Sequence, residues 1–179
     1  MLMNTHDQYG LISRLLHWII FALVIGMLLG GGLLAILPSG GFKNFIVGIH
    51  KSVGVVVFGL MLARLVWRRF NPQPRALTGI PMLNYIAQMV HVCLYVLLLL
   101  QPLVGILMSQ AYGYPVSVFG WFKLPPLIWH SPAIGNVLFE IHGATAVVLT
   151  VIIAIHAAAG LVHHFIFQDR TLMRMIKGQ

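Results

Sequence analysis

The sequence has 179 residues, of which 59% are hydrophobic and only 8% are charged. This composition excludes an ordinary soluble enzyme, because a soluble domain needs a charged surface that water can solvate. Eleven basic and three acidic residues give a net charge of +8, but the basic residues lie between long apolar runs, which argues for membrane topology and against nucleic-acid binding.

Four apolar runs are each long enough to cross a membrane as a helix, which takes roughly 20 residues. They cover residues 12–36, 45–67, 83–109 and 134–167, to within a few positions. Clusters of proline, glycine and asparagine separate them, as expected of connecting loops. We therefore predict an all-α membrane protein, a four-transmembrane-helix bundle that forms a single domain over residues 1–179.

The Lys and Arg residues near the helix ends predict the orientation, since short loops rich in them stay in the cytoplasm. With the amino terminus inside, the cytoplasmic side receives Arg14, Arg64, Arg68, Arg69, Arg75, Arg170, Arg174 and Lys177. The outer side receives Lys43, Lys51 and Lys123. This distribution predicts that both termini are cytoplasmic, with the aromatic stretch VSVFGWFKLPPLIW covering the outer end.

Histidines are the unusual reactive residues, because the one cysteine, Cys93, excludes a disulfide framework and a thiolate-ligated cluster. His142 and His156 lie fourteen residues apart on the fourth predicted helix. That spacing is roughly 21 Å along the axis and about 40° short of four full turns. The two histidines therefore share one face, with His142 near the outer boundary and His156 near the inner one.

Each of these histidines has a candidate partner at its own depth. His17 lies in the first turns of a helix that enters from inside, and His50 in the first turns of a helix that enters from outside. The predicted pairs are His17 with His156 and His50 with His142. Two imidazoles facing across a bundle, with no carboxylate or thiolate beside them, favour axial ligation of haem iron over tetrahedral zinc.

The chain resembles the bacterial cytochrome b561 family, the small four-helix dihaem b proteins of the inner membrane. The resemblance covers nearly the whole chain and rests on YGLISRLLHW, IHKSVG, RLVWRRFNPQP, HVCLYVLLLLQPLVG, PVSVFGWF and, most specifically, IHAAAGLVHHFIFQDRTLMRM. It implies two b haems on His17, His50, His142 and His156. It also implies electron transfer between the periplasmic side and the quinone pool, with one branch oxidising superoxide and reducing ubiquinone.

Three further residues are candidates for cofactor binding at the inner depth. His91 is an alternative inner ligand, although a hydrogen bond to a propionate, a quinone or a neighbouring helix fits it better. Arg64 lies fourteen residues after His50, so it points from the same face at the inner depth. Arg64 and Arg14 each suit a haem propionate, but both equally suit a membrane anchor whose charged end reaches the headgroups.

The catalytic candidates lie at the two ends of the bundle. Lys51 follows His50 and gives the outer end of the bundle a positive charge. This charge would attract an anionic donor such as superoxide. His163 and His164 lie about two turns beyond His156, where imidazoles could deliver protons to a reduced quinone. Each has a plainer interpretation as an interfacial side chain that contacts lipid headgroups.

These features predict a dihaem b electron carrier of the bacterial inner membrane that acts as an oxidoreductase of the superoxide:quinone type. Its expected partners are membrane lipid, ubiquinone or another quinone, and superoxide. One alternative is a haem b relay subunit that serves a separate dehydrogenase or soluble cytochrome as its redox partner. A histidine-based metal transporter is a further alternative, although the chain lacks the intramembrane acids expected along a cation path.

Overall fold

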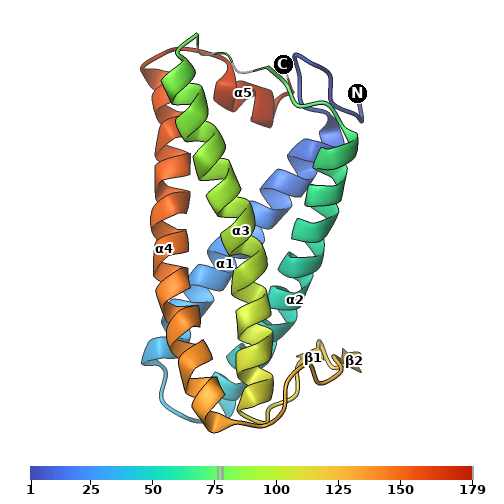
Figure 1. Cartoon of the computed structure of the whole chain (residues 1–179), viewed down its shortest axis with the longest axis vertical. Helices are drawn as coiled ribbons and strands as arrows, with labels where there is room; N and C mark the ends of the chain where they lie inside the picture. Colours follow the sequence, from blue (N-terminus) through green and yellow to red (C-terminus); the bar gives the residue numbers. More distant parts are fainter. Residues whose placement is uncertain (76, 78, 179) are drawn as a thin grey trace.

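Four long helices run the length of the molecule in a computed structural model that describes residues 1–75, 77 and 79–178 (Figure 1). In chain order the elements are α1 (Leu11–Ile36), α2 (Gly41–Phe70), α3 (Pro81–Ala111), β1 (Ser117–Val118), β2 (Phe122–Lys123), α4 (Pro132–Phe165) and α5 (Thr171–Ile176). Helices α1 to α4 are each long and apolar enough to cross a membrane, so the prediction of a four-helix membrane bundle is confirmed. That residues 1–179 fold as one domain stays a prediction.

The helix ends differ from the sequence-based limits by a few residues. Helices α2 and α3 extend beyond their apolar stretches, because polar residues such as Lys43 and Arg68 continue the helix into the interface. Helix α4 begins at Pro132, after Ser131 accepts a hydrogen bond from the Ile134 amide. It ends at Phe165, two residues before the predicted limit. The short helix α5 was not predicted, since six residues carry no readable periodicity.

The helices pack in sequence order, α1 on α2, α2 on α3 and α3 on α4. A buried cluster of Ile20, Val24, Val57 and Met61 joins α1 and α2 near the middle of the bundle. Many apolar side chains point outward, such as that of Val147, which is 66% exposed. This distribution is expected for spans surrounded by lipid, where packing between helices rather than exclusion of water holds a bundle together.

The two ends of the bundle are built differently (Figure 1). At one, the hairpin end, β1 and β2 pair antiparallel and turn at Phe119 and Gly120, both with positive φ. The hairpin is fixed to α2, because the Phe119 amide donates to Ser52 Oγ and Ser52 Oγ donates to the Ser117 carbonyl. The predicted orientation makes this end the periplasmic one.

Both chain termini lie at the other end, the termini end (Figure 1). Here buried Arg174 of α5 donates to the Asp7 carbonyl and, over 2.9 Å, to the Arg75 carbonyl. The Arg75 amide in turn donates to the His6 carbonyl over 2.8 Å. One guanidinium therefore joins the amino-terminal segment, the α2–α3 connection and α5 into a cap over this end.

Candidate functional site

At the hairpin end, the structure brings His50 of α2 and His142 of α4 together. Their ring centroids lie 6.3 Å apart, with the ring planes inclined by 75°. Both rings are half-buried. The two residues are 92 positions apart in the sequence, so this contact depends on the packing of the whole bundle.

Helix α3 fixes His142 from the side, through residues that the sequence analysis missed. A Cβ atom on Gly105 would lie 3.0 Å from Cε1 of His142, so only glycine leaves the ring this much room. Gln101 Nε2 donates to the His142 carbonyl over 2.9 Å, and Thr145 Oγ1 donates to Gln101 Oε1. Gly105 lies fourteen residues after His91, so the spacing rule that linked His142 and His156 could have found it.

Small residues of α1 also leave space beside His50. Cβ atoms on Gly30 and Gly31 would lie 3.8 and 3.6 Å from its ring, which is ordinary contact. An apolar cavity of about 200 Å³, lined by residues that include Gly26 and Gly30, opens beside the same ring. The surface beside the His50–His142 pair is thus apolar and nearly flat, so a flat group could lie against it.

At the termini end, three histidines converge rather than two. The ring centroids of His17 on α1 and His156 on α4 lie 6.2 Å apart, inclined by 68°. His91 of α3 lies closer still to His156, at 5.3 Å. All three rings are half-buried. The structure therefore brings together the predicted pair, His17 and His156, and the alternative inner ligand, His91.

Arg64 completes this cluster from α2. Its Nη1 lies 3.1 Å from Nδ1 of His17, and its Nε donates to the Tyr95 hydroxyl over 3.2 Å. A guanidinium can only donate, so Nδ1 of His17 accepts this hydrogen bond and its hydrogen lies on Nε2. The guanidinium also lies over the Tyr95 ring, 5.9 Å from its centroid, where it gains a cation–π attraction.

Arg14 contacts the carboxyl-terminal segment of the chain. Its Nη1 donates to the Ile176 carbonyl over 2.9 Å, at the end of α5. Nearby, Trp18 Nε1 donates to the Met175 carbonyl over 2.9 Å. In this arrangement Arg14 fastens α1 to the carboxyl-terminal segment.

Lys51 lies one residue after His50 and faces the loop between α3 and β1. Its Nζ donates to the Pro115 carbonyl over 3.0 Å and lies 3.4 Å from Ser109 Oγ. Both partners are neutral, so the positive charge of the ammonium is not cancelled by these contacts. The structure thus holds a cation beside the hairpin-end pair.

The neighbouring histidines at the end of α4 have different surroundings. Both rings pack edge-on against a phenylalanine, His163 on Phe167 and His164 on Phe165. His163 differs in that its Nδ1 also pairs with Asp169 Oδ2 at 2.5 Å. Sequence reasoning missed Asp169. The only signal for it was the His-x5-Asp spacing across a helix end, which does not specify a contact.

The two cross-helix pairs have a spacing at which the two imidazoles of a pair could hold one metal ion between them, as in a haem. An imidazole nitrogen binds a metal at about 2 Å and lies roughly 1 Å from its ring centroid, so two axial imidazoles have centroids about 6 Å apart. The observed 6.3 and 6.2 Å agree with this. Among the described residues, the buried His142 Nδ1 has no hydrogen-bond partner, and no group of three or more His, Cys, Asp or Glu is placed to hold a bare metal ion.

A bundle of four membrane spans with facing histidine pairs is typical of a membrane cytochrome. Comparison with known families agrees, since residues 8–178 match the model of the prokaryotic cytochrome b561 family. The chain belongs to that family.

Relatives resemble the chain over almost its full length. "Cytochrome b561 homolog 2" of Escherichia coli is 34% identical over 175 residues, which are 97% of this chain and 93% of that protein. "Cytochrome b561 homolog 1" of the same organism is 30% identical over 163 residues, 90% of this chain and 92% of that protein. "Probable superoxide oxidase CybB" of Yersinia pestis is 27% identical over 172 residues, 96% of this chain and 97% of that protein.

Family membership and the four spans establish the general character of the protein. It is a multi-pass protein of the bacterial inner membrane and a membrane electron carrier of the cytochrome b561 family. Membership also implies that it binds haem b.

Proposed function

We propose that the chain is a dihaem b electron carrier, in which His50 and His142 hold one haem and His17 and His156 hold the other. The observation that supports this is one arrangement repeated at two depths, with facing rings whose centroids lie 6.3 and 6.2 Å apart. Bound haem supplies one-electron redox chemistry. The helices fix the depth of each site, roughly 21 Å apart along α4.

The proposed direction of transfer is from a periplasmic donor to the quinone pool. The excess of Lys and Arg at the termini end supports a cytoplasmic location for both termini and leaves the hairpin end outside. Lys51 holds a positive charge beside His50 and would attract an anionic donor. Superoxide is the candidate donor, in line with the name of the Yersinia pestis relative.

Arg64 is proposed to bind a haem propionate at the termini end. Ligation through Nε2 of His17 requires the ring hydrogen on Nδ1, which then no longer accepts from Arg64. The guanidinium would be left to donate to a carboxylate, for which its fork geometry is suited. His91 lies within reach of the same site and is proposed to hydrogen-bond rather than to ligate iron.

Quinone is proposed to bind at the termini end, near His163 and His164. These residues lie about two turns beyond His156, between the inner site and the aqueous phase. The ring of His163 is only partly exposed, with 18% of its side-chain surface accessible. A proton could therefore pass from water to a quinone through this turn of α4.

The test is electron transfer by the purified, haem-loaded protein. It is given superoxide and a short-chain ubiquinone analogue, and quinol formation is followed against a His50→Ala control. We expect superoxide-dependent quinone reduction by the wild type and its loss in the control. Equal rates in both would refute the proposed activity and favour a relay subunit that needs a separate redox partner.

A further inference from the structure

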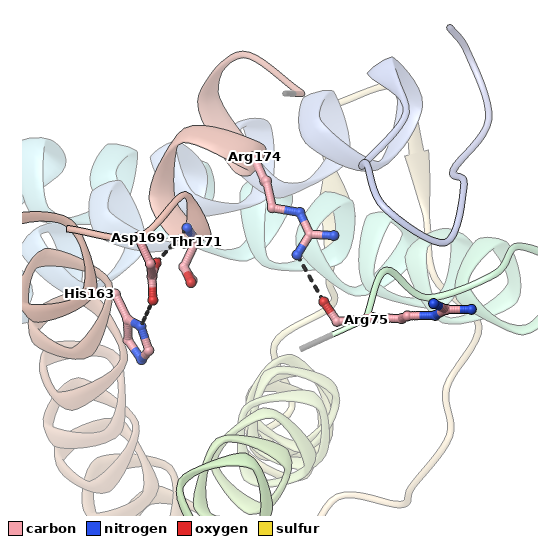
Figure 2. Close-up of polar contacts among 5 residues, drawn as sticks. All are labelled: Arg75, His163, Asp169, Thr171 and Arg174. Carbon is pink, nitrogen blue, oxygen red and sulfur yellow. Dashed lines mark hydrogen bonds and ion pairs between the residues drawn. The ribbon is translucent and has the colours of Figure 1, made fainter. Parts of the chain in front are cut away.

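The end of α4 carries a histidine–carboxylate pair that a tight reversal of the chain brings together (Figure 2). The Phe167 amide donates to the Val162 carbonyl and the Asp169 amide to the His163 carbonyl, which closes the helix end. Gln168 takes a left-handed backbone conformation, with φ of 53°, to make this turn. Asp169 Oδ2 thereby reaches His163 Nδ1 at 2.5 Å.

Both oxygens of the Asp169 carboxylate are engaged. Oδ2 contacts His163, while Oδ1 accepts from the Thr171 amide over 2.8 Å (Figure 2). Burial alone would raise the pKa of Asp169, but the hydrogen bonds from Thr171 and His163 outweigh it and hold that pKa below its ordinary value. The side chain is therefore ionised at neutral pH and can only accept hydrogen bonds.

An acceptor on one side of an imidazole determines which nitrogen carries the hydrogen. Since Asp169 only accepts, Nδ1 of His163 must donate, and Nε2 is the nitrogen that can gain and lose a proton. Among the described residues, none is placed to hydrogen-bond to that Nε2 atom. His163 is thus held in the Nδ1–H tautomer. Its Nε2, the nitrogen that gains and loses a proton, is directed away from the Asp169 carboxylate.

Neighbouring charges do not compete for this pair. Arg174 of α5 donates instead to the main-chain carbonyl of Arg75 (Figure 2) and to that of Asp7. Arg170, the residue before α5, is exposed, and His164 of α4 packs on Phe165. The first two turns of α3, which packs against α4, contain no Asp, Glu, Lys, Arg or His. Among the described residues, Asp169 is therefore the charged group whose contact with Nδ1 determines the tautomer of His163.

We propose that His163, and not His164, is the proton donor to quinone, and that Asp169 is the positioning residue that prepares it. This inference rests on the proposed quinone reductase function. Reduction of a quinone to a quinol takes two electrons, supplied by the haem-loaded carrier, and two protons, one for each oxygen. Doubly protonated His163 gives its Nε2 proton to one quinone oxygen and keeps its own Nδ1 hydrogen, which stays hydrogen-bonded to Asp169. Water supplies the proton for the other quinone oxygen and reprotonates Nε2.

The kinetic test uses the full-length, haem-loaded protein, reduced with dithionite and mixed anaerobically with ubiquinone-1. We expect Asp169→Asn and His163→Gln each to slow haem reoxidation at least about tenfold, whereas His164→Gln stays within about twofold of the wild type. Asp169→Glu should recover part of the rate.

A second readout does not depend on turnover. With ¹⁵N-labelled histidine, the His163 signal, assigned by its absence in His163→Gln, should show the Nδ1–H tautomer in the wild type and lose that preference in Asp169→Asn. Haem content should be the same in all variants. An unchanged tautomer, or a His164→Gln variant slower than His163→Gln, would overturn the inference.

The two readouts separate this inference from the function on which it rests. If ubiquinone-1 fails to reoxidise the wild-type haems, the proposed quinone reductase function is wrong, while the tautomer still reports whether Asp169 positions His163. If the wild type is reoxidised and Asp169→Asn is equally fast over the whole pH range, the function stands and the inference fails.

Discussion

The hairpin-end and termini-end sites have nearly the same ring separation but different surroundings. His50 and His142 face each other beside glycines and an apolar cavity, with Lys51 as the neighbouring cation. His17 and His156 are joined by a third histidine and by Arg64, which contacts His17 directly. One fold thus provides two histidine pairs whose electrostatic environments differ, as the proposed carrier with two unequal redox centres would require.

The two sites also differ in the kind of contact on which each depends. The hairpin-end site depends on space, since a methyl group at Gly105 would press on the His142 ring. The termini-end site depends on charge and hydrogen bonds, through Arg64 and Tyr95. The two sites should therefore be sensitive to different substitutions.

The largest expected effect comes from the ligand pairs themselves. His50→Ala and His142→Ala should each remove the hairpin-end haem, and His17→Ala and His156→Ala the other, with a loss of about half of the bound haem in every case. Haem quantification with redox titration identifies the haem that remains. If the two variants of one pair lose different haems, the pairing is wrong.

Next in size is a steric change that should affect only the hairpin end. Gly105→Ala places a methyl group 3.0 Å from the His142 ring, and overpacking of this kind costs about 1–3 kcal/mol. We expect a lower melting temperature and partial loss of the hairpin-end haem. Gly143→Ala, beside His142 but with nothing within 4 Å of its Cβ, is the matched control and should behave like the wild type.

A charge change should affect only the termini end. Arg64→Leu removes a positive charge that stabilises the electron-rich reduced state, so the midpoint potential of the termini-end haem should fall by about 60 mV, a tenfold change for one electron. Arg69→Leu, at an exposed position five residues further along α2, is the control. Equal shifts of both haems would contradict the assignment of Arg64 to one site.

The third histidine gives a smaller effect that sharpens the comparison. His91→Gln keeps a hydrogen-bonding side chain, so both haems should remain, with a small shift in the potential of the termini-end haem. Haem quantification and redox titration measure this. Loss of that haem in His91→Gln, together with its retention in His17→Ala, would make His91 the ligand.

The smallest expected effect is a loss of stability at acidic pH in the turn that follows α4. The folded pKa of Asp169 is depressed, so its contribution is present above the ordinary Asp value of about 3.9 and is lost as the pH falls through the lower folded value. Hydrogen exchange of the Thr171 amide should accelerate relative to its intrinsic rate over that range. In Asp169→Asn this additional acid dependence should be absent, and its persistence would assign it to another group.

The periodicity and hydropathy of the sequence predict the four spans and the faces on which the histidines lie, but not the contacts between helices. The fourteen-residue spacing placed His142 and His156 on one face, and hydropathy located the four spans. The approach of Gly105 to His142 depends on how α3 packs against α4, which no local pattern reports. Asp169 reaches His163 only because the backbone turns back at Gln168, and the contact of Arg64 with His17 depends on how α1 packs against α2.

The most direct test of the central claim is the stoichiometry of haem in the purified chain, combined with its low-temperature electron paramagnetic resonance spectrum. Two b haems per chain, both low-spin with bis-histidine signals, are expected from two ligand pairs at two depths. A single haem per chain would contradict the account. A colourless protein made with ample haem supply would do so more strongly and would favour a histidine-based metal transporter.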